Sequence, residues 1–307
     1  ISFNSKDKQD ISLMIDNLGI DYIEGGWPGA NPTDDDFFSN LPKLKKSKFS
    51  AFGMTCKPNV SAQNDPGLNG LINSEATSIC IVGKSWKFHL EHAMNISAQE
   101  NYKMISTSIK HIVNKGKEAL FDAEHFFDGY KDDPDFALKC IKAAYENGAR
   151  WVVLCDTNGG TLPSEIYKII LEVKKHIPGE NLSIHCHNDT GNAVANSIAA
   201  VEAGVRQIQG TINGLGERCG NANLISLIPT LMLKMNYDVG INEDQLKNLV
   251  KTSHFLDNII TKDSDRFAPY VGEFAFAHKG GLHVSAIAKN PKSYEHIEPE
   301  IIGNKRK

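Results

Sequence analysis

Apolar and polar residues follow two periodicities along this chain, and the two alternate. Segment 6–18 carries apolar residues at helical spacing, from Ile11 to Leu18, and stops at Gly19, which predicts a helix. A short apolar run, 20–24, follows and ends at two glycines, which predicts a strand. The same unit recurs down the chain. This alternation indicates a parallel sheet covered by helices.

Seven segments have the short apolar runs typical of strands, and helical stretches lie between them. The predicted strands are 20–24, 49–52, 77–82, 119–124, 151–155, 182–187 and 206–210. The predicted helices are 6–18, 34–41, 66–73, 98–113, 134–147, 163–176, 193–203 and 221–234. A closed (β/α)8 barrel has eight strands, so we expect the first strand upstream of Ile1. An open doubly wound sheet is the alternative, but polar residues follow almost every strand, as a barrel mouth requires.

The periodicity breaks beyond Asp238. A polar, turn-rich stretch follows at 263–269, and the two glycines within 274–287 indicate a loop that leads into a helix. The predicted fold class is therefore α/β, a TIM barrel over 1–237 followed by a small, mostly helical accessory region over 238–307.

Composition and charge favour some kinds of binding partner and some cellular compartments over others. The net charge of −4 comes with scattered lysines, which argues against nucleic-acid and membrane partners and favours small polar substrates. No apolar stretch is long enough to span a membrane. Six cysteines lie far apart without a Cys-x-x-Cys motif, as in proteins of a reducing compartment, so we expect a cytoplasmic location.

Two histidines stand at the end of one predicted strand. His185 and His187 share a strand face because side chains alternate with a period of two, so both imidazoles can reach one ion. A side-chain oxygen of Asn221 would complete a mixed nitrogen and oxygen site for a divalent metal such as Mg²⁺, Mn²⁺ or Zn²⁺. The alternative is a strand end whose histidines only form hydrogen bonds.

Carboxylates end two other predicted strands. Asp122 and Glu124 share one strand face, and the apolar residues beside them share the other, so both carboxylates are expected to point into the barrel mouth. One of them could act as an acid or base, and Asp122 is a candidate substrate contact, with ion pairs to lysines as the alternative. Glu24 ends an earlier strand and is a candidate substrate contact, or the partner of an ion pair.

Two further loops follow strands on the same predicted face. Thr157 can donate a hydrogen bond to an anionic substrate, or cap a turn. The run from Gly214 to Gly220 resembles a phosphate cradle, but its spacing is not the dinucleotide fingerprint. The preferred interpretation is that its glycines permit a tight loop that carries Glu217, Arg218 and Asn221 toward the metal.

Together these motifs resemble a family of metal-dependent Claisen-condensation enzymes and lyases, which includes 2-isopropylmalate, homocitrate and citramalate synthases and HMG-CoA lyase. The resemblance covers nearly the whole chain, and Gly216-Glu217-Arg218 favours its synthase branch. Three segments, WPGANP, DAEHFFDG and AHKGGLHVSA, look most like the citramalate synthases. The resembling segments are 23–32, 121–130, 155–163, 185–197, 210–224 and 275–286.

The resemblance implies an activity and a role for each site residue. It implies that acetyl-CoA condenses with a 2-oxo acid, pyruvate in the citramalate branch, in an enzyme that is a homodimer. It also implies an Arg-Asp-Gly motif upstream of Ile1, without which we would expect no activity. The implied roles are metal ligands for His185, His187 and Asn221, the catalytic carboxylate for Glu124, a substrate carboxylate contact for Thr157, and a catalytic acid/base for His283, often supplied by the partner subunit.

Three alternatives stay open. The same chemistry could act on another 2-oxo acid, such as 2-oxoisovalerate, 2-oxobutyrate or 2-oxoglutarate, because pocket size decides the substrate. A lyase of the same family would cleave an acyl-CoA instead. A catalytically inactive metal-binding subunit is the third possibility, and the upstream motif would discriminate it.

Overall fold

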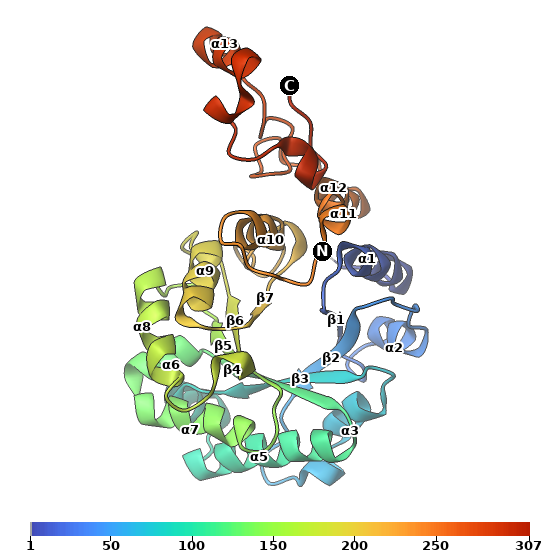
Figure 1. Ribbon diagram of the computed structural model, residues 1–307. Coiled ribbons are helices and arrows are strands. Elements are labelled where there is room, and N and C mark those ends of the chain that lie inside the picture. Colours follow the sequence, from blue (N-terminus) through green and yellow to red (C-terminus); the bar gives the residue numbers. More distant parts are fainter. Residues whose placement is uncertain (1) are drawn as a thin grey trace.

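The core of the molecule is one curled sheet of parallel strands. The computed structural model describes residues 2–307, in which seven strands follow chain order across the sheet, each paired with the next. The sheet curls around an interior while helices cover its outer side (Figure 1). The strands are β1 (Tyr22–Gly26), β2 (Lys48–Met54), β3 (Ser78–Lys84), β4 (Glu118–Glu124), β5 (Trp151–Asp156), β6 (Leu182–Cys186) and β7 (Gln207–Gln209).

Helices connect the strands, and local signals set their ends. The connecting helices are α1 (Ser5–Leu18), α2 (Pro32–Ser39), α3 (Pro66–Asn73), α4 (Lys87–His89), α5 (Ala98–Asn114), α6 (Phe126–Asp132), α7 (Pro134–Tyr145), α8 (Pro163–Val173), α9 (Ala193–Ala203) and α10 (Leu224–Leu233), with short turns η1 (Ala62–Asn64), η2 (Leu90–Met94), η3 (Gly179–Asn181) and η4 (Ile212–Gly214). The side chain of Asn4 caps α1 by accepting from the N–H of Asp7, and Gly19 ends the helix in the left-handed conformation.

Alternation along the strands separates two faces. Phe121 and Ala123 of β4 are fully buried in the main core between the sheet and its helices. Leu120 belongs to a separate small cluster, which it forms with Cys80 and Trp151. Because the side chains between the apolar ones face the interior, the strands present their polar residues to the space that the sheet encloses.

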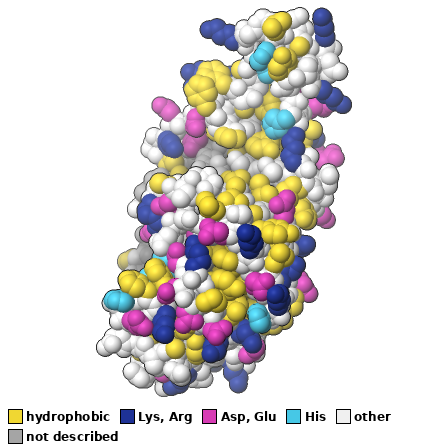
Figure 2. Space-filling model, turned by 90° about the vertical axis from the view of Figure 1, so that its left-hand side faces the viewer, with side chains coloured by type: hydrophobic (Ala, Val, Ile, Leu, Met, Phe, Trp, Pro, Cys, Tyr) yellow, Lys and Arg dark blue, Asp and Glu magenta, His cyan; other side chains and the backbone are white. Residues whose placement is uncertain are grey.

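The C-terminal region packs on one side of the barrel. Its elements are α11 (Glu243–Leu246), α12 (Leu249–Ile259), α13 (Gly281–Lys289), η5 (Pro291–Ser293) and η6 (Pro299–Ile302). A second apolar core joins Leu18 of α1 and Ile228 of α10 to Leu249 and Phe276 of this region. The far end, with α13, projects away from the sheet (Figure 1). Hydrophobic side chains are visible on this upper end in Figure 2.

A cavity lies between the first and last strands. Within residues 2–307, β1 pairs only with β2 and β7 only with β6, so each has one free edge. The cavity has a volume of about 930 Å³, and its lining includes Ile23 and Glu24 of β1 and Gln207 and Gln209 of β7. This cavity lies where the strand expected upstream of Ile1 would pair with both free edges.

The predicted barrel architecture and all seven predicted strands are confirmed, with ends shifted by at most a few residues. One difference is β6, which ends at Cys186, so His187 lies just beyond the strand. Helix α6 was not predicted, because it begins after His125, a left-handed residue without a capping side-chain hydrogen bond. The expected upstream strand falls outside the described residues. Among residues 2–307, no helix has both the length and the apolar character needed to cross a membrane.

Candidate active site

The two predicted metal-binding histidines lie together at the carboxyl end of β6. Their ring centroids are 5.2 Å apart. His187 forms an isolated antiparallel bridge with Asn221, which brings the loop after β7 onto the end of β6. The backbone N–H of Ala222 donates to the carbonyl of Cys186 at 3.0 Å and fixes the same contact. The three predicted ligands are therefore held at one place, although Asn221 comes from a later loop than the histidines.

Two of these side chains have buried polar atoms without a protein partner. Within residues 2–307, Nδ1 of His187 and Oδ1 of Asn221 are buried and form no hydrogen bond. Since a buried polar group without a partner is costly, an orphaned pair at one site points to a bound group. A Cβ on Gly216 would stand 2.7 Å from Oδ1 of Asn221, so glycine keeps this space open. Two imidazoles and an amide oxygen suit a divalent cation.

The ring of His185 is oriented by a residue that sequence analysis missed. Nδ1 of His185 lies 2.8 Å from Oε1 of Gln209, its neighbour in the β6–β7 register. An amide oxygen only accepts, so Nδ1 carries the proton and Nε2 keeps its lone pair. The amide nitrogen of Gln209 donates in turn to Oδ1 of Asp122 at 3.1 Å. Such a relay fixes the tautomer that a metal ligand requires. In the described part of the chain, no group of three or more His, Cys, Asp or Glu side chains is placed to hold a metal, so this candidate site has only two such side chains and needs the amide of Asn221.

The carboxylates Asp122 and Glu24 face the barrel interior. Asp122 is buried, and the thiol of Cys80 donates to its Oδ1 at 3.1 Å. Burial raises the pKa of Asp122, although His185 opposes the shift. Glu24 is open to the large cavity but enclosed on its other sides, and this enclosure, together with the charge of Asp122, raises the pKa of Glu24. Both groups are thus biased toward the neutral acid.

Glu124 stands at the end of β4 and forms an ion pair with Lys84 of β3. The two residues are direct neighbours in the register of these parallel strands. The ion pair with a lysine, which was the alternative role for this carboxylate, therefore exists. It leaves the side chain half-buried at the barrel mouth, with about a quarter of its surface exposed (26%).

Two hydrogen bonds from neighbouring loops hold Thr157 in place. Its hydroxyl accepts a hydrogen bond from the N–H of His125 at 2.8 Å, which leaves its own proton free to donate. Its carbonyl accepts from the guanidinium of Arg218 at 2.7 Å. Thr157 is therefore fixed at the mouth, next to the β4 loop.

Arg218 ties three loops together. Its guanidinium donates to both carboxylate oxygens of Asp189, at 2.7 and 2.8 Å, and holds the pKa of that carboxyl below its usual range. Burial lowers the pKa of His187 to about 4, with further contributions from His185 and Arg218. His187 is therefore neutral at physiological pH, which is the form that binds metals.

The remaining predicted residue, His283, is not near this cluster in the same chain. It lies on α13, which has no buried residue, and its ring stacks on Tyr294 at a centroid distance of 4.0 Å. Helix α13 lies at the end of the molecule farthest from the sheet (Figure 1). A role for His283 at the barrel mouth thus requires a second copy of the chain.

Two residues that contact the candidate site, Gln209 and Lys84, were not predicted from the sequence. The signal for Gln209 was available, because two glutamines alternate with apolar residues in the predicted strand 206–210, which is unusual for an inner barrel face. Lys84 extends β3 by two residues beyond the predicted strand end, and its contact depends on the register with β4.

The sequence of the barrel matches the model of a known protein family. The family model described as HMGL-like matches residues 1–254. The chain belongs to the HMGL-like family. A second model, described as Homocitrate synthase post-HMGL domain-like, matches residues 270–307 of this HMGL-like chain.

Named relatives and a solved structure agree with this assignment. The HMGL-like chain is 52% identical to (R)-citramalate synthase of Aquifex aeolicus, across 100% of this chain and 58% of that protein. It is 50% identical to (R)-citramalate synthase of Geobacter sulfurreducens, across 99% of this chain and 58% of that protein. The chain thus spans little more than half the length of these curated relatives. A structure of HMG-CoA lyase from Acinetobacter baumannii with coenzyme A and 3-methylmalate shares the fold, with a TM-score of 0.70, 19% identity, and coverage of 90% of this chain and 88% of that one.

Proposed function

We propose that this protein catalyses the metal-dependent condensation of acetyl-CoA with pyruvate to give citramalate and coenzyme A. The observation that carries the proposal is the meeting of His185, His187 and Asn221, with orphaned buried atoms on the last two. The similarity to (R)-citramalate synthases supports pyruvate as the 2-oxo acid. We propose these three residues as ligands of a divalent metal, with Mg²⁺, Mn²⁺ and Zn²⁺ as candidates.

The side chains of the site would have different roles in the reaction. A divalent metal, when bound, would supply Lewis-acid polarisation of the 2-oxo group. The hydroxyl of Thr157 would donate to the carboxylate of pyruvate. Asp122 and Glu24, biased toward the neutral acid, would contact the substrate as hydrogen-bond donors.

Glu124 is our candidate for the base. It would remove a proton from the methyl group of acetyl-CoA, and the carbanion would form the new carbon–carbon bond to the 2-oxo carbon of pyruvate. The electron pair of the carbonyl π bond would move to its oxygen, which would take up a proton and become the hydroxyl of citramalate. Water would then hydrolyse the thioester and release coenzyme A as the thiol. The ion pair with Lys84 would hold Glu124 at the mouth, within reach of a bound substrate.

We further propose a homodimer in which His283 acts as an acid/base in the partner's site. The segment around α13 exposes large apolar side chains, with Leu282 83% and Val284 48% exposed. Such a surface fits burial against a second chain.

Complementation tests this arrangement. We expect His283→Ala and Glu124→Gln to be inactive alone, and an equal mixture that has exchanged subunits to regain about a quarter of wild-type activity, since half of the dimers are hybrids with one intact site. A mixture that stays inactive, although mass spectrometry shows hybrid dimers, would contradict the shared site.

The direct test of function is thiol release from acetyl-CoA. The full protein is assayed with pyruvate, 2-oxobutyrate, 2-oxoisovalerate and 2-oxoglutarate, each with Mg²⁺, Mn²⁺ or Zn²⁺. We expect pyruvate to be strongly preferred and citramalate to be the product. Preference for a branched acid would overturn the substrate and keep the reaction. Release of acetyl-CoA from an acyl-CoA would indicate a lyase, and no turnover with retained metal would indicate an inactive subunit.

We also propose a cytoplasmic location. All six cysteines are free thiols, and five of them are buried in the barrel. This usage fits a reducing compartment. Fractionation of cells that express the tagged protein tests the proposal.

A further inference from the structure

The loop that carries Asn221 is held at its start by a helix of the C-terminal region. Asn213 lies in η4, in the left-handed conformation with φ of 59°. Its next residue, Gly214, accepts a hydrogen bond through its carbonyl from the N–H of Asn221 at 3.0 Å. The loop therefore folds back so that Asn221 rests on the residue after Asn213.

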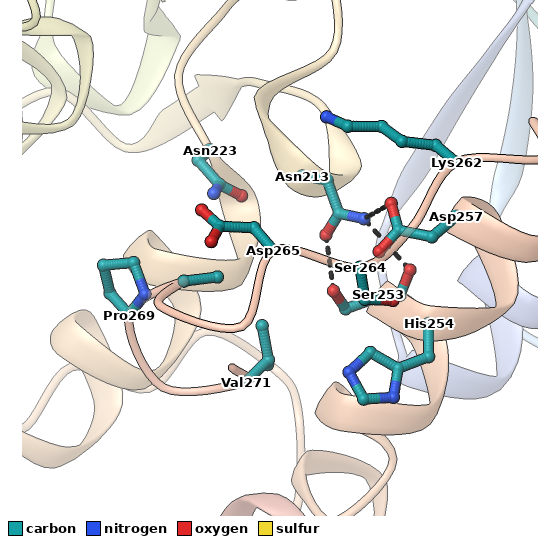
Figure 3. Close-up of a pocket in the computed structure, with 11 residues that line it drawn as sticks. Asn213, Asn223, Ser253, His254, Asp257, Lys262, Ser264, Asp265, Pro269 and Val271 are labelled. Carbon is teal, nitrogen blue, oxygen red and sulfur yellow. Dashed lines mark hydrogen bonds between the residues drawn. The ribbon is translucent and has the colours of Figure 1, made fainter. Parts of the chain in front are cut away.

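The side chain of Asn213 is bonded to α12 through both of its polar atoms. Its amide nitrogen donates to Oδ1 of Asp257 and to the carbonyl of Ser253, each at 3.0 Å. Its amide oxygen accepts from the hydroxyl of Ser253 at 2.7 Å. Figure 3 shows these bonds converging on the amide. Both helix residues are buried, at 2% and 6% exposure.

The contact between Asn213 and α12 borders a gap in the packing. A cavity of about 150 Å³ lies beside it, lined by Asn213 and Asn223 from the loop side and by Asp265 and Pro269 from the C-terminal side (Figure 3). Continuous packing is thus interrupted here. The left-handed backbone is uncommon for a residue other than glycine, and it persists only where its surroundings fix it.

We propose that Asn213 is a positioning residue, through which helix α12 sets the location of the Asn221 amide in the metal site. The path is short: α12 binds Asn213, and the adjoining Gly214 carbonyl holds the N–H of Asn221. The C-terminal region would thereby tune metal affinity without touching the metal. This inference rests on the metal site of the proposed function.

Substitution of Asn213 by glycine removes the side chain without straining the backbone, because glycine adopts the left-handed conformation freely. Asn236→Gly is the matched control, since Asn236 is also left-handed, with φ of 57°, and is exposed beyond α10. Mn²⁺ binding to the full protein is measured by calorimetry. We expect Asn213→Gly to weaken Mn²⁺ binding about tenfold, and Asn236→Gly to leave it within about twofold of wild type. Equal affinities in the two variants would overturn the proposal.

Ser253→Ala covers the case in which Asn213→Gly does not fold. It removes only one of the three bonds, and we expect a smaller loss of Mn²⁺ affinity, about threefold, with little change in thermal midpoint. A lower midpoint with unchanged Mn²⁺ affinity would mean that the contact only stabilises the fold, and would overturn a positioning role. Because Mn²⁺ binding needs no turnover, failure of the pyruvate assay with the expected Mn²⁺ results would refute the proposed reaction and not this inference.

Discussion

Replacement of Gln209 by leucine should weaken metal binding although Gln209 is not a ligand. The substitution keeps similar bulk but removes the acceptor that lies 2.8 Å from Nδ1 of His185 and the donor that lies 3.1 Å from Asp122. Without the acceptor, the imidazole can rotate or take the other tautomer, which puts a proton on the nitrogen that should bind the metal.

The size of the effect follows from the hydrogen bonds that the substitution removes. Loss of one partner that orients a ligating histidine typically costs about 10–100-fold in metal affinity, which corresponds to roughly 1.4–2.7 kcal/mol. Asp122 loses one of its hydrogen bonds as well but keeps the thiol of Cys80. We therefore expect Gln209→Leu to bind Mn²⁺ about 10–100-fold more weakly than wild type.

Calorimetric titration with Mn²⁺ measures this change, and Gln207→Leu is its control. Gln207 lies two residues earlier on β7 and lines the same cavity. Its Oε1 is buried and has no hydrogen-bond partner within residues 2–307, so leucine there should be neutral or stabilising. If both variants bind Mn²⁺ as tightly as wild type while their thermal midpoints match, the relay from Gln209 to His185 has no role in metal binding.

Four further substitutions test the site and the fold. His187→Ala should abolish metal retention in metal analysis, whereas Glu124→Gln should retain the metal and lose turnover. Gly220→Ala should destabilise the protein by about 1–3 kcal/mol in thermal denaturation, because Gly220 has φ of 92° and a Cβ would stand 2.0 Å from the carbonyl of Gly214. Asp16→Asn should destabilise the protein by about 1–3 kcal/mol at neutral pH, because its carboxylate accepts from the three backbone N–H groups of residues 45–47.

The pH dependence gives Asp16→Asn a second readout. Burial favours the neutral acid, but the backbone donors prevail and hold the pKa of Asp16 below its ordinary value of 3.8. A lowered carboxyl pKa adds stability that is present above the ordinary value and is lost as the pH falls through the folded-state pKa. The stability difference between wild type and variant, followed by denaturant titration, should therefore shrink in that acidic range. A constant difference down to the lowest accessible pH would contradict this account.

Results opposite to the other expectations are equally informative. Normal turnover by Glu124→Gln would remove that carboxylate from the reaction, and metal retained by His187→Ala would remove the imidazole from the ligand set. An unchanged melting temperature for Gly220→Ala would mean that the loop has room that the structure does not show.

The strands, and the placement of two histidines at the end of one of them, could be predicted because both depend on local sequence. Apolar runs of fixed length identify the strands, and the period of two puts His185 and His187 on one face. The resemblance to a known family then supported Asn221 as the third candidate ligand. What brings Asn221 to the site is the bridge from His187, a contact between loops that no local pattern encodes.

Contacts that depend on strand register could not be predicted. Glu124 meets Lys84, and His185 meets Gln209, because neighbouring parallel strands align those positions, and a shift of one residue would separate each pair. The same limit applies to Asn213, whose partners lie on a helix 40 residues farther along. Helix α6 was not predicted at all, because it starts from a left-handed His125 that carries no helix-start signal.

The unequal pairing of the strands implies unequal protection from hydrogen exchange. Strands β3 and β4 are bonded on both sides and flanked by buried side chains, so their amides should open only with global unfolding. Within residues 2–307, β1 and β7 each pair on one side only, and the strand expected upstream of Ile1 would bond to both free edges. In a chain limited to residues 1–307, deuterium uptake should therefore begin in β1 and β7 and spread inward, whereas in a longer protein that supplies the expected strand both should be protected as well as β3 and β4.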